Sequence, residues 1–435
     1  MTEEHQPDLI EELRWRGLLH QCTDEPGLRE HLDLSLGGGP RRIYAGFDPT
    51  ADSLTIGNLV PIMVLRHVQR AGHEPVVVMG GGTGLIGDPS GKSAERQLMT
   101  PETVETHIDR QRPIFESLLG GDVTIKNNAD WLSGISYLEA LRDIGKHFSV
   151  NMMMQKESVK SRLEDRDQGI SYTEFSYMIL QAYDFAELFE KHGVTVQCGG
   201  SDQYGNMVAG TDLVRRRAFA ASRGDAESFA FTAPLVTKSD GGKFGKTETG
   251  AIWLTRERTS PYAYFQFWLN AADADIGPFL RTFTLLPKAE IERLERSMAE
   301  NPGAREAQRA LAREATSLLH GSAEAAAAES AGKALFSGEI AGLSADLLDE
   351  VLAGAPSSEL PRDRLSAGVD LVELLLDLGL AKSKREAKQF VESGSVSING
   401  QAASTGRSLA VDDLLHGRVI AMRRGKKNWH VTRWV

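Results

Sequence analysis

The order of elements around residue 60 constrains the fold more than any other feature of the sequence. Residues 41–47 (RRIYAGF) are typical of a short strand, residues 59–71 carry apolar side chains at helical spacing, and residues 75–79 (PVVVM) are typical of a buried strand. Strand, helix and strand joined by a crossover of about a dozen residues form a parallel βαβ unit. This region is therefore predicted to belong to an open α/β sheet.

The pattern recurs further along the chain. A helix is expected at 177–191 and a strand at 194–198, before a glycine turn. We predict that the sheet extends from residue 40 to about residue 235 and binds ligands at the carboxyl ends of its strands. With 435 residues, 41% of them hydrophobic, the chain can bury further cores beyond this sheet.

Composition divides the remainder of the chain. Residues 260–354 are rich in Ala, Glu, Leu and Arg with helical periodicity, which predicts a separate helical domain. Residues 355–367 open with APSSELP, a linker composition. Two short helices and a strand are expected after it, in a small α+β domain at 368–435.

Charge is unevenly distributed. The formal net charge of −11 argues against a nucleic-acid coat protein. However, residues 416–435 contain six Lys or Arg and no Asp or Glu. This asymmetry indicates a nucleic-acid-binding tail on an acidic body.

Several classes of protein are excluded by composition. Cys22 and Cys198 are too few for a disulfide framework or a cysteine zinc site, and the eleven histidines form no His-Glu-x-x-His pattern. We expect no metal site. The acidic N-terminus is unlike a secretory signal and no apolar run reaches about 18 residues, so a cytoplasmic protein without a membrane span is expected.

The glycine cluster GGGTGLIGDPSGK, residues 80–92, matches two nucleotide fingerprints only in part. Gly82-x-Gly84-x-x-Gly87 follows a strand, but Asp88 and Pro89 break the helix that a dinucleotide site requires. Ile86 stands where a P-loop would place its first glycine before Lys92. Both interpretations therefore fail.

Two other stretches are compatible with phosphate. Gly57, in TIGN (55–58), lets a ligand approach the first turn of a helix, where free N–H groups favour an anion; the alternative is an ordinary helix with Asn58 as its N-cap. In KSDGGKFGKTETG, Lys243 and Lys246 can neutralise charge on a leaving pyrophosphate, and the alternative is a solvated basic turn.

Five motifs in order give the region from Tyr44 to Trp268 a family resemblance. They are YAGFDPTADSLTIGNL, GTGLIGDPSGK, TEFSYMILQAYDF, GGSDQYGN and KFGKT, and together they resemble bacterial tyrosyl-tRNA synthetases, which are class I aminoacyl-tRNA synthetases. The resemblance continues through the helical region and the C-terminal domain. It implies an enzyme that makes tyrosyl-adenylate from L-tyrosine and ATP, then transfers tyrosine to the 3′-terminal adenosine of tRNA(Tyr).

The resemblance also implies an architecture. The implied architecture begins with a Rossmann-type parallel-sheet catalytic domain with an N-terminal helical extension at 1–235. A phosphate-binding loop at 236–259, a helical anticodon-binding domain at 260–354, a linker at 355–367 and an RNA-binding domain at 368–435 follow it. ATP is implied as a substrate with Mg²⁺, without a tightly bound cofactor. A homodimer is implied as well.

Residue roles follow from the same resemblance. Tyr44 and Asp184 correspond to the pair that hydrogen-bonds the phenolic hydroxyl, and such a pair is left unsatisfied by phenylalanine. Asp88, Tyr177 and Gln181 correspond to groups that hold the α-amino group. Tyr177, Gln181 and Asp184 share one helical face, for which a polar stripe satisfied internally is the alternative.

The implied ATP contacts extend from the ribose to the pyrophosphate. Asp202 has a second interpretation, as a cap of the following helix. No general base is required, because the enzyme supplies position and charge. The implied contacts are Gly200 and Asp202 at the ribose, Gln203 near the α-phosphate, Gly46, Asp48 and Gly57 along ATP, and Thr50, Thr55, Asn58, Lys92, Arg96, Lys243, Lys246 and Thr247 around the phosphates.

The TIGN stretch departs from the family pattern, which is usually His-x-Gly-His. Asn58 offers an amide donor where an imidazole N–H is expected. Thr55 is shorter than histidine, so its γ-phosphate contact is expected to be lost, mediated by water or shared with Thr50. One missing transition-state donor costs about 10² to 10³ in rate. We expect an active enzyme; a diverged paralogue with another substrate and an RNA-binding protein on an inactive scaffold are the alternatives.

The C-terminal region is similar to a small RNA-binding domain shared with a ribosomal protein. Its basic residues are expected to bind tRNA phosphates, while Trp429, His430 and Trp434 either stack on bases or pack internally. The SVNMMMQKE segment, 149–157, lies where the family forms its homodimer, and core packing is the alternative.

Overall fold

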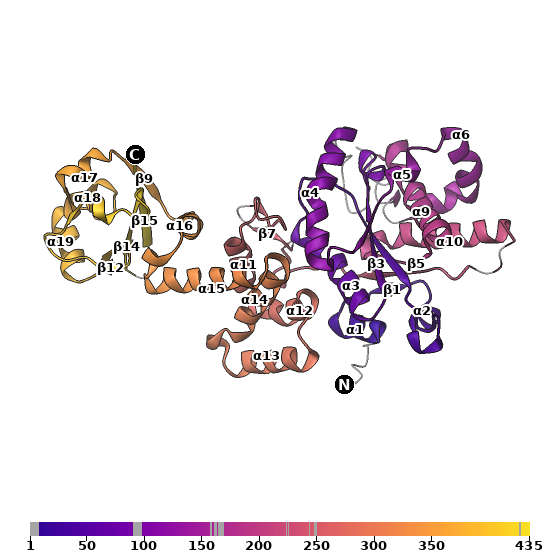
Figure 1. The fold of residues 1–435 in the computed structure, drawn as a ribbon, viewed down its shortest axis with the longest axis horizontal. Helices are drawn as coiled ribbons and strands as arrows, with labels where there is room; N and C mark the ends of the chain where they lie inside the picture. The colour runs from indigo at the N-terminus through magenta and orange to yellow at the C-terminus, as the bar shows by residue number, and fades with distance from the viewer. Residues whose placement is uncertain are drawn as a thin grey trace. The chain divides into compact units, whose positions relative to one another are not determined.

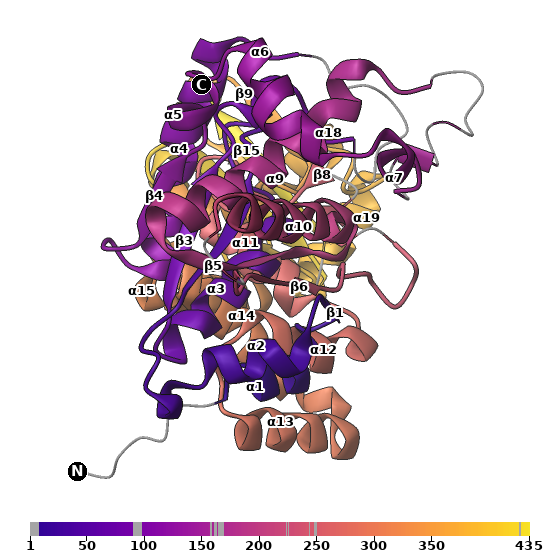
Figure 2. The ribbon, with the colours of Figure 1, turned by 90° about the vertical axis from the view of Figure 1, so that its right-hand side faces the viewer.

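The computed structural model describes residues 8–89, 98–156, 159–160, 163, 169–222, 224, 226–242, 244–247, 250–425 and 428–435. Figures 1 and 2 show the ribbon from two sides. The chain forms two compact units, of which the first comprises Met1–Thr259 and Ala271–Leu311 and the second comprises Ser260–Asn270 and Ala312–Val435. The helical region expected at 260–354 is thus divided between the two units.

A six-stranded sheet forms the centre of the first unit. Its spatial order is β1 (Gln21–Cys22), β6 (Phe229–Ala233), β5 (Val194–Gly200), β2 (Arg42–Phe47), β3 (Glu74–Met79) and β4 (Thr124–Asn127). Neighbouring strands from β6 to β4 are parallel, and β1 pairs antiparallel with β6. The predicted α/β fold is confirmed. Strand order reverses between β2 and β5, the position where such sheets bind ligands.

Helices cover both faces of this sheet. Tyr44, Val76 and Val78 pack against α9 and α10 on one face, whereas α3 contacts β2 and β3 from the other. This two-sided burial explains the nearly continuous apolar run of β3. The helices are α1 (Leu9–Arg16), α2 (Glu25–Leu32), α3 (Leu59–Arg70), α4 (Pro101–Leu119), α5 (Ala129–Leu132), α6 (Tyr137–Glu139), α7 (Val150–Met154), α9 (Tyr172–His192), α10 (Tyr204–Ala220), α12 (Asp273–Phe283), α13 (Lys288–Glu300) and α14 (Glu306–His320), which contains the boundary at Leu311.

The second unit combines helices with a five-stranded sheet. The sheet order is β12 (Gln401–Ala402), β11 (Val396–Ile398), β14 (Val419–Arg424), β15 (Asn428–Trp434) and β9 (Ser357–Leu360), and β10 (Val369–Asp370) pairs with β13 (Ser408–Leu409). The helices are α11 (Pro261–Leu269), α15 (Ser322–Ser337), α16 (Ala345–Leu352), α17 (Asp363–Ala367), α18 (Leu371–Asp377) and α19 (Lys384–Glu392).

Residues 355–367, expected as a linker, instead contain β9 and α17. β9 pairs in parallel with β15, with Ser357 opposite Val431 and Leu360 opposite Trp434. The turn-forming composition of this stretch is visible locally, but its partner strand lies more than seventy residues away. The edge of β15 therefore decides the conformation of β9.

The aromatic residues of the C-terminal strand pack internally. Trp429 and Trp434 are 9% and 3% exposed, and His430 is buried with Nε2 3.0 Å from Ser358 Oγ. Trp429 belongs to a core with Leu348 of α16, so the packing alternative holds for these side chains.

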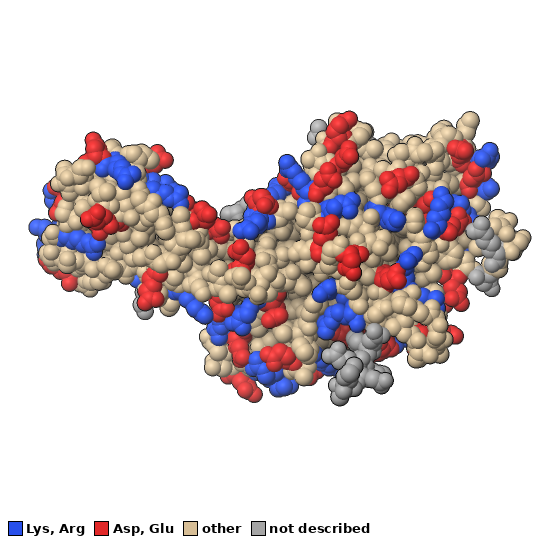
Figure 3. All heavy atoms as spheres, in the orientation of Figure 1, with Lys and Arg blue, Asp and Glu red and all other residues tan. Residues whose placement is uncertain are grey.

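The four described arginines of the basic tail are also engaged within their unit. Each bonds to a carboxylate or a carbonyl oxygen, and acidic and basic side chains are interspersed on the face drawn in Figure 3. The contacts are Arg418 and Arg433 with Asp349, Arg423 with the carbonyl of Phe336, and Arg424 with the carbonyl of Leu380. Lys426 and Lys427 lie outside the described residues.

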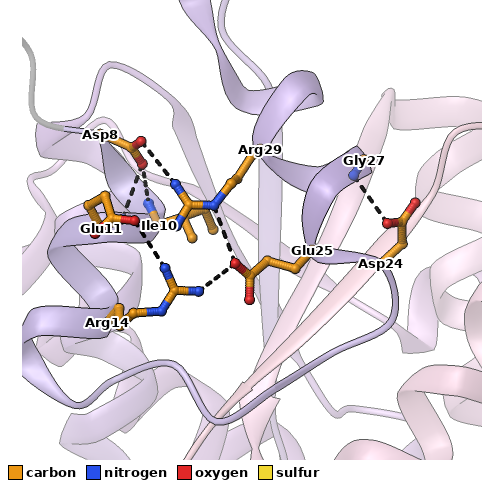
Figure 4. Close-up of polar contacts among 8 residues, drawn as sticks. All are labelled: Asp8, Ile10, Glu11, Arg14, Asp24, Glu25, Gly27 and Arg29. Carbon is orange, nitrogen blue, oxygen red and sulfur yellow. Dashed lines mark hydrogen bonds and ion pairs between the residues drawn. The ribbon is translucent and has the colours of Figure 1, made fainter.

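The N-terminal extension is joined by an exposed charge network (Figure 4). Arg14 of α1 pairs with Glu11 and with Glu25 of α2, and Arg29 of α2 pairs with Asp8, Glu11 and Glu25. A single exposed ion pair contributes little, but shared partners make the two helices one cluster.

Among the described helices, none is long and apolar enough to cross a membrane.

Candidate active site

A cavity of about 570 Å³ lies at the carboxyl ends of β2 and β5, where the strand order reverses. Most of the residues proposed from the sequence line it. They are Tyr44, Gly46, Asp48, Thr50, Gly57, Asn58, Asp88, Tyr177, Gln181, Asp184, Gly200, Asp202 and Gln203. Strands β2, β3 and β5, helix α9 from Tyr177 to Asp184 and the turn before α10 therefore supply one common site.

The floor of the cavity holds Tyr44 and Asp184. Asp184 Oδ1 accepts a hydrogen bond from Trp131 Nε1 at 2.7 Å, and its Oδ2 accepts one from Asn128 Nδ2 at 2.9 Å. Burial raises the pKa of the Asp184 carboxyl from 3.8 to about 7. The Tyr44 hydroxyl is fully buried and has no hydrogen-bond partner among the residues described. The Tyr44 hydroxyl thus lacks a hydrogen-bond partner, and burying it unpaired costs free energy unless a ligand supplies the partner.

A hydrogen-bond chain continues from the floor to the middle of the cavity. Asn128 Nδ2 donates to Thr83 Oγ1 at 2.9 Å, Thr83 Oγ1 donates to Asp48 Oδ1 at 2.8 Å, and Tyr177 OH donates to Asp48 Oδ2 at 2.8 Å. Burial and the Asp48 charge raise the pKa of Tyr177 well above its ordinary value. These bonds orient the Tyr177 ring and the Asp48 carboxylate together.

Gly80, the first glycine of the cluster after β3, packs against two members of this hydrogen-bond chain, Asp48 and Thr83. A Cβ at Gly80 would lie 2.1 Å from Asp48 Oδ1 and 2.6 Å from Thr83 Oγ1. No side chain fits there without displacing the carboxylate. Close packing, which the dinucleotide and P-loop fingerprints do not describe, accounts for this glycine.

Acidic groups surround the middle of the cavity. Gln203 Nε2 donates to Asp88 Oδ2 at 2.6 Å, and Asn206 Nδ2 donates to Gln181 Oε1 at 3.0 Å. Burial raises the pKa of Asp202, and the Asp88 charge adds to this effect. Carboxylates at these positions suit an ammonium group and ribose hydroxyls. α10 begins without a side-chain cap.

The TIGN stretch forms the 3₁₀ turn η2 (Ile56–Asn58) before α3. Both the backbone N–H and the hydroxyl of Thr55 donate to Asn58 Oδ1, each at 3.0 Å. Asn58 occupies the N-cap position of α3, but its side chain makes no capping bond to that helix, because Oδ1 accepts from Thr55 instead. Gly57 and Asn58 line the cavity, whereas Thr55 is not among the lining residues.

The backbone of this turn is held by residues 252–254. Thr55 forms an antiparallel bridge with Trp253, Ile56 N–H donates to the Ile252 carbonyl at 2.9 Å, and Leu254 N–H donates to the Leu54 carbonyl at 2.9 Å. The KFGKT segment also lies close, since a Cβ on Gly245 (φ +75°) would be 2.3 Å from Ile56 Cγ2. Two motifs about 190 residues apart in the chain therefore meet at one edge of the cavity.

The remaining phosphate candidates are described only in part. Lys92, Arg96 and Lys243 lie outside the described residues, and Lys246 and Thr247 are described only as backbone in β7 (Lys246–Thr247), which pairs with β8 (Gly250–Ala251). Phe244 lines the cavity, and its ring contacts Phe279 and Phe283 of α12, both at 5.2 Å. Phe244 is therefore anchored beside the cavity by its ring contacts with α12.

Sequence reasoning missed several polar groups of the site. Asn128 and Trp131 directly follow β4, and polar residues at the carboxyl end of a parallel strand were the signal available for them. Thr83 lies within the glycine cluster. Gln197, on β5, lines the cavity with an Oε1 that has no partner in the described part of the chain.

Two family models match the chain. Residues 37–337 match the family described as tRNA synthetases class I (W and Y), and residues 348–432 match the tyrosine–tRNA ligase SYY-like C-terminal domain. Both compact units are thus covered.

Curated proteins and a solved structure show the same similarity. The chain is 47% identical over 434 residues to the tyrosine–tRNA ligase of Roseiflexus castenholzii, covering 98% of this chain and 99% of that protein. It is 48% identical over 433 residues to the one from Geobacillus kaustophilus, covering 98% and 100%. A C-terminally truncated Aspergillus nidulans mitochondrial tyrosyl-tRNA synthetase has a TM-score of 0.68 and 31% identity, covering 77% of this chain and 96% of that one.

Proposed function

Because the chain belongs to the tyrosine–tRNA ligases of the class I tRNA synthetases, we propose that the cavity at the carboxyl ends of β2 and β5 binds L-tyrosine at its floor and ATP at its mouth. The enzyme activates L-tyrosine with ATP and transfers it to tRNA. The proposal concerns which residues perform each step.

The observation that carries the tyrosine assignment is the unsatisfied floor. The phenolic hydroxyl of the substrate donates to Asp184, whose two oxygens are oriented by Asn128 and Trp131, and accepts from the buried Tyr44 hydroxyl. Phenylalanine would leave both groups unpaired. Tyrosine-specific synthetases of this family are known to reject phenylalanine by about 10⁵, and this floor has the chemistry that such rejection requires.

The activation step needs positioning and charge. Asp88, Tyr177 and Gln181 hold the α-ammonium group, so that a tyrosine carboxylate oxygen faces the α-phosphorus of ATP. The new bond joins that oxygen to phosphorus, the bond to the bridging oxygen of the β-phosphate breaks, and pyrophosphate leaves. In the second step a ribose hydroxyl of the tRNA 3′-adenosine attacks the carbonyl carbon, and AMP leaves.

The ATP contacts follow the cavity outward from the sheet. Gly200 and Asp202 face the ribose and Gln203 the α-phosphate, while Gly46, Asp48 and Gly57 let the nucleotide lie close to the backbone. Thr50 and Asn58 contact the outer phosphates. Lys92, Arg96, Lys243, Lys246 and Thr247 remain predictions for the pyrophosphate.

Mg²⁺ accompanies ATP in this proposal. In the described ranges, no three His, Cys, Asp or Glu side chains are grouped to hold a metal ion. Mg²⁺ commonly binds through substrate phosphates with few protein ligands. When bound, Mg²⁺ would be held mainly by the triphosphate and would supply positive charge there.

The second unit is proposed to bind tRNA(Tyr), with the anticodon-binding part within 260–354 and an RNA-binding domain at 368–435. Because the described tail arginines are engaged internally, the phosphate contacts fall to the exposed cations around α19. Lys382, Arg385 and Lys388 are exposed, and no ion pair is recorded for them among the described residues. Lys384, on the same helix, pairs with Glu373 at 3.0 Å.

A homodimer in the cytoplasm completes the proposal. Large apolar side chains are exposed on α6, on α7 and beside them, including Tyr137, Leu138, Val150, Met152 and Met154. Only Met153 of the methionine run is buried. An apolar surface of this kind supports burial against a second copy of the chain.

The direct test is ATP–pyrophosphate exchange with tyrosine, phenylalanine and tryptophan supplied separately. We expect exchange with tyrosine alone. Asp184→Ala is expected to reduce the preference for tyrosine over phenylalanine by about 10³ or more, because the hydroxyl loses its acceptor.

Other outcomes have distinct meanings. Exchange with tryptophan alone would favour a diverged paralogue, and no exchange with any amino acid would favour an RNA-binding protein on an inactive scaffold. Undiminished tyrosine selectivity in Asp184→Ala would refute the assignment of the floor.

A further inference from the structure

We propose that Thr55 is a positioning residue, which holds the carboxamide oxygen of Asn58 so that the Asn58 amide group donates to the ATP phosphates, and that Thr55 itself does not contact ATP. The inference rests on the proposed binding of ATP at the mouth of the cavity. It assigns different tasks to the two residues at which TIGN departs from the family pattern.

The hydrogen bonds determine which end of the Asn58 side chain faces Thr55. Thr55 N–H and Thr55 Oγ1 both lie 3.0 Å from Asn58 Oδ1. A backbone N–H can only donate, so an amide group in that position would place two donors face to face. The oxygen must therefore point to Thr55, and the NH₂ group, on the other side of the same planar carboxamide, points away from it.

Turned away from Thr55, the NH₂ group can face the cavity that Asn58 lines. Asn58 and its neighbour Gly57 line the cavity, whereas Thr55 does not. Among the described residues, a Cβ added to Gly57 would meet only Thr55 Oγ1, at 3.7 Å, so none of these residues fills the space over this turn. An amide donor beside an open glycine at the start of α3 fits a phosphate oxygen.

The backbone of Thr55 is held in place, so its hydroxyl cannot both donate to Asn58 and reach ATP in the cavity. Thr55 bridges to Trp253, and the adjacent Leu54 and Ile56 are each bonded to residues 252–254. Ile56 is fully buried beneath Gly245. Turning the hydroxyl towards the cavity would abandon its bond to Asn58 while the backbone stayed in place.

The arrangement gives each substitution a function. A histidine at position 58 would present a ring N–H, but an asparagine can present either an acceptor or a donor to the cavity. The Thr55 N–H and hydroxyl remove that ambiguity. The hydroxyl forgoes a direct phosphate contact and instead fixes the donor on its neighbour.

A mutant cycle with a matched acceptor variant tests the proposal. Asn58→Ala removes the donor and is expected to lower kcat/KM for ATP about 10²-fold. Thr55→Val keeps the backbone N–H and the shape but removes the hydroxyl, and is expected to lower it about tenfold. Thr55→Ser keeps the hydroxyl and should restore most of that loss. In the Asn58→Ala background, Thr55→Val should cause no further loss.

Asn58→Asp separates orientation from local structure. The carboxylate still accepts both bonds from Thr55, so the turn is preserved, yet it offers no donor and repels phosphate. We expect a loss at least as large as in Asn58→Ala, with an unchanged thermal midpoint and an unchanged KM for tyrosine. ATP use close to that of the unaltered enzyme in Asn58→Asp would overturn the proposal.

The two possible failures are distinguishable. If Asn58→Ala leaves kcat/KM for ATP unchanged, the placement of ATP at this turn is wrong, and the proposed function fails at this residue. If Asn58→Ala is impaired but Thr55→Val causes the same fold loss in both backgrounds, ATP is placed correctly and only the positioning role is refuted.

Discussion

At the scale of single residues, the chemistry of the site depends on how buried polar groups are partnered. Asp184 is nearly inaccessible, yet it accepts two hydrogen bonds and has a pKa raised to about 7. Tyr44 beside it has no partner in the described chain. A ligand hydroxyl would satisfy both groups, so recognition and protonation are coupled at this position.

We therefore expect tyrosine binding to release a proton. The phenolic hydroxyl stabilises the ionised carboxylate, so binding lowers the Asp184 pKa from about 7 towards its ordinary value. Close to one proton per tyrosine should be released at about pH 6 and few at about pH 8, and tyrosine affinity should weaken by up to about tenfold per unit below pH 7.

Titration calorimetry in buffers of different ionisation enthalpy measures this release. Asp184→Asn is the control, since it keeps the shape and cannot ionise. An affinity that stays constant from pH 6 to pH 8 would contradict the coupling.

At the scale of elements, two glycines near the cavity have different reasons to be glycine. In the described part of the chain, the nearest contact of a Cβ added to Gly57, in η2, would be Thr55 Oγ1 at 3.7 Å. Gly80, after β3, is packed against Asp48 and Thr83. In the proposed function ATP requires the first glycine, whereas the packing of the site requires the second.

The pair Gly57→Ala and Gly80→Ala separates these two demands. Gly57→Ala should leave the free energy of unfolding within about 0.5 kcal/mol and raise KM for ATP, because the new methyl group occupies the ligand's space. Gly80→Ala should destabilise the fold by about 1 to 3 kcal/mol and weaken both substrates. Urea unfolding and exchange kinetics provide both readouts. A Gly57→Ala enzyme with normal ATP kinetics would show that ATP does not approach this turn.

At the scale of the whole molecule, the residues proposed for adenylate formation and those proposed for tRNA binding lie in different compact units. All residues that line the cavity belong to the first unit, whereas the cations of α19 belong to the second. Ending the chain at residue 367 would remove β15, the partner of β9. It would also expose the α16 side chains that pack in a core with β14 and β15. Surface variants of the full chain are therefore the sounder way to separate adenylate formation from charging.

Charge reversal at Lys382, Arg385 and Lys388 is the corresponding prediction. The triple change to Glu should raise KM for tRNA about tenfold or more at low salt, because phosphate contacts are exchanged for repulsion, and the loss should shrink as added salt screens both effects. ATP–pyrophosphate exchange in the same preparation is the internal control and should be unaffected. Lys384→Glu, at a lysine already paired with Glu373, should cost less. Normal charging by the triple variant would exclude α19 as a tRNA contact.

Much of the fold and many of the candidate residues could be predicted because they depend on short-range patterns. The apolar period of α3, the buried run of β3 and the glycines at turns are visible within a dozen residues, and they led to the parallel sheet. Helical spacing together with the family resemblance indicated that Tyr177, Gln181 and Asp184 share one pocket, and all three line the cavity. The charged tail was also evident locally, although charge alone did not show that its arginines are engaged.

The sequence by itself thus determined which segments form strands, which faces of the helices are apolar and which residue types are available for the cavity. Only the tertiary structure decided that Asn128 and Trp131 orient Asp184, that β9 joins β15, and that Thr55 faces Asn58 and is absent from the cavity lining. The physical reason is range. Periodicity and turn chemistry act between neighbours in the chain, whereas a hydrogen bond's direction and a strand's partner depend on groups brought together by the packed core.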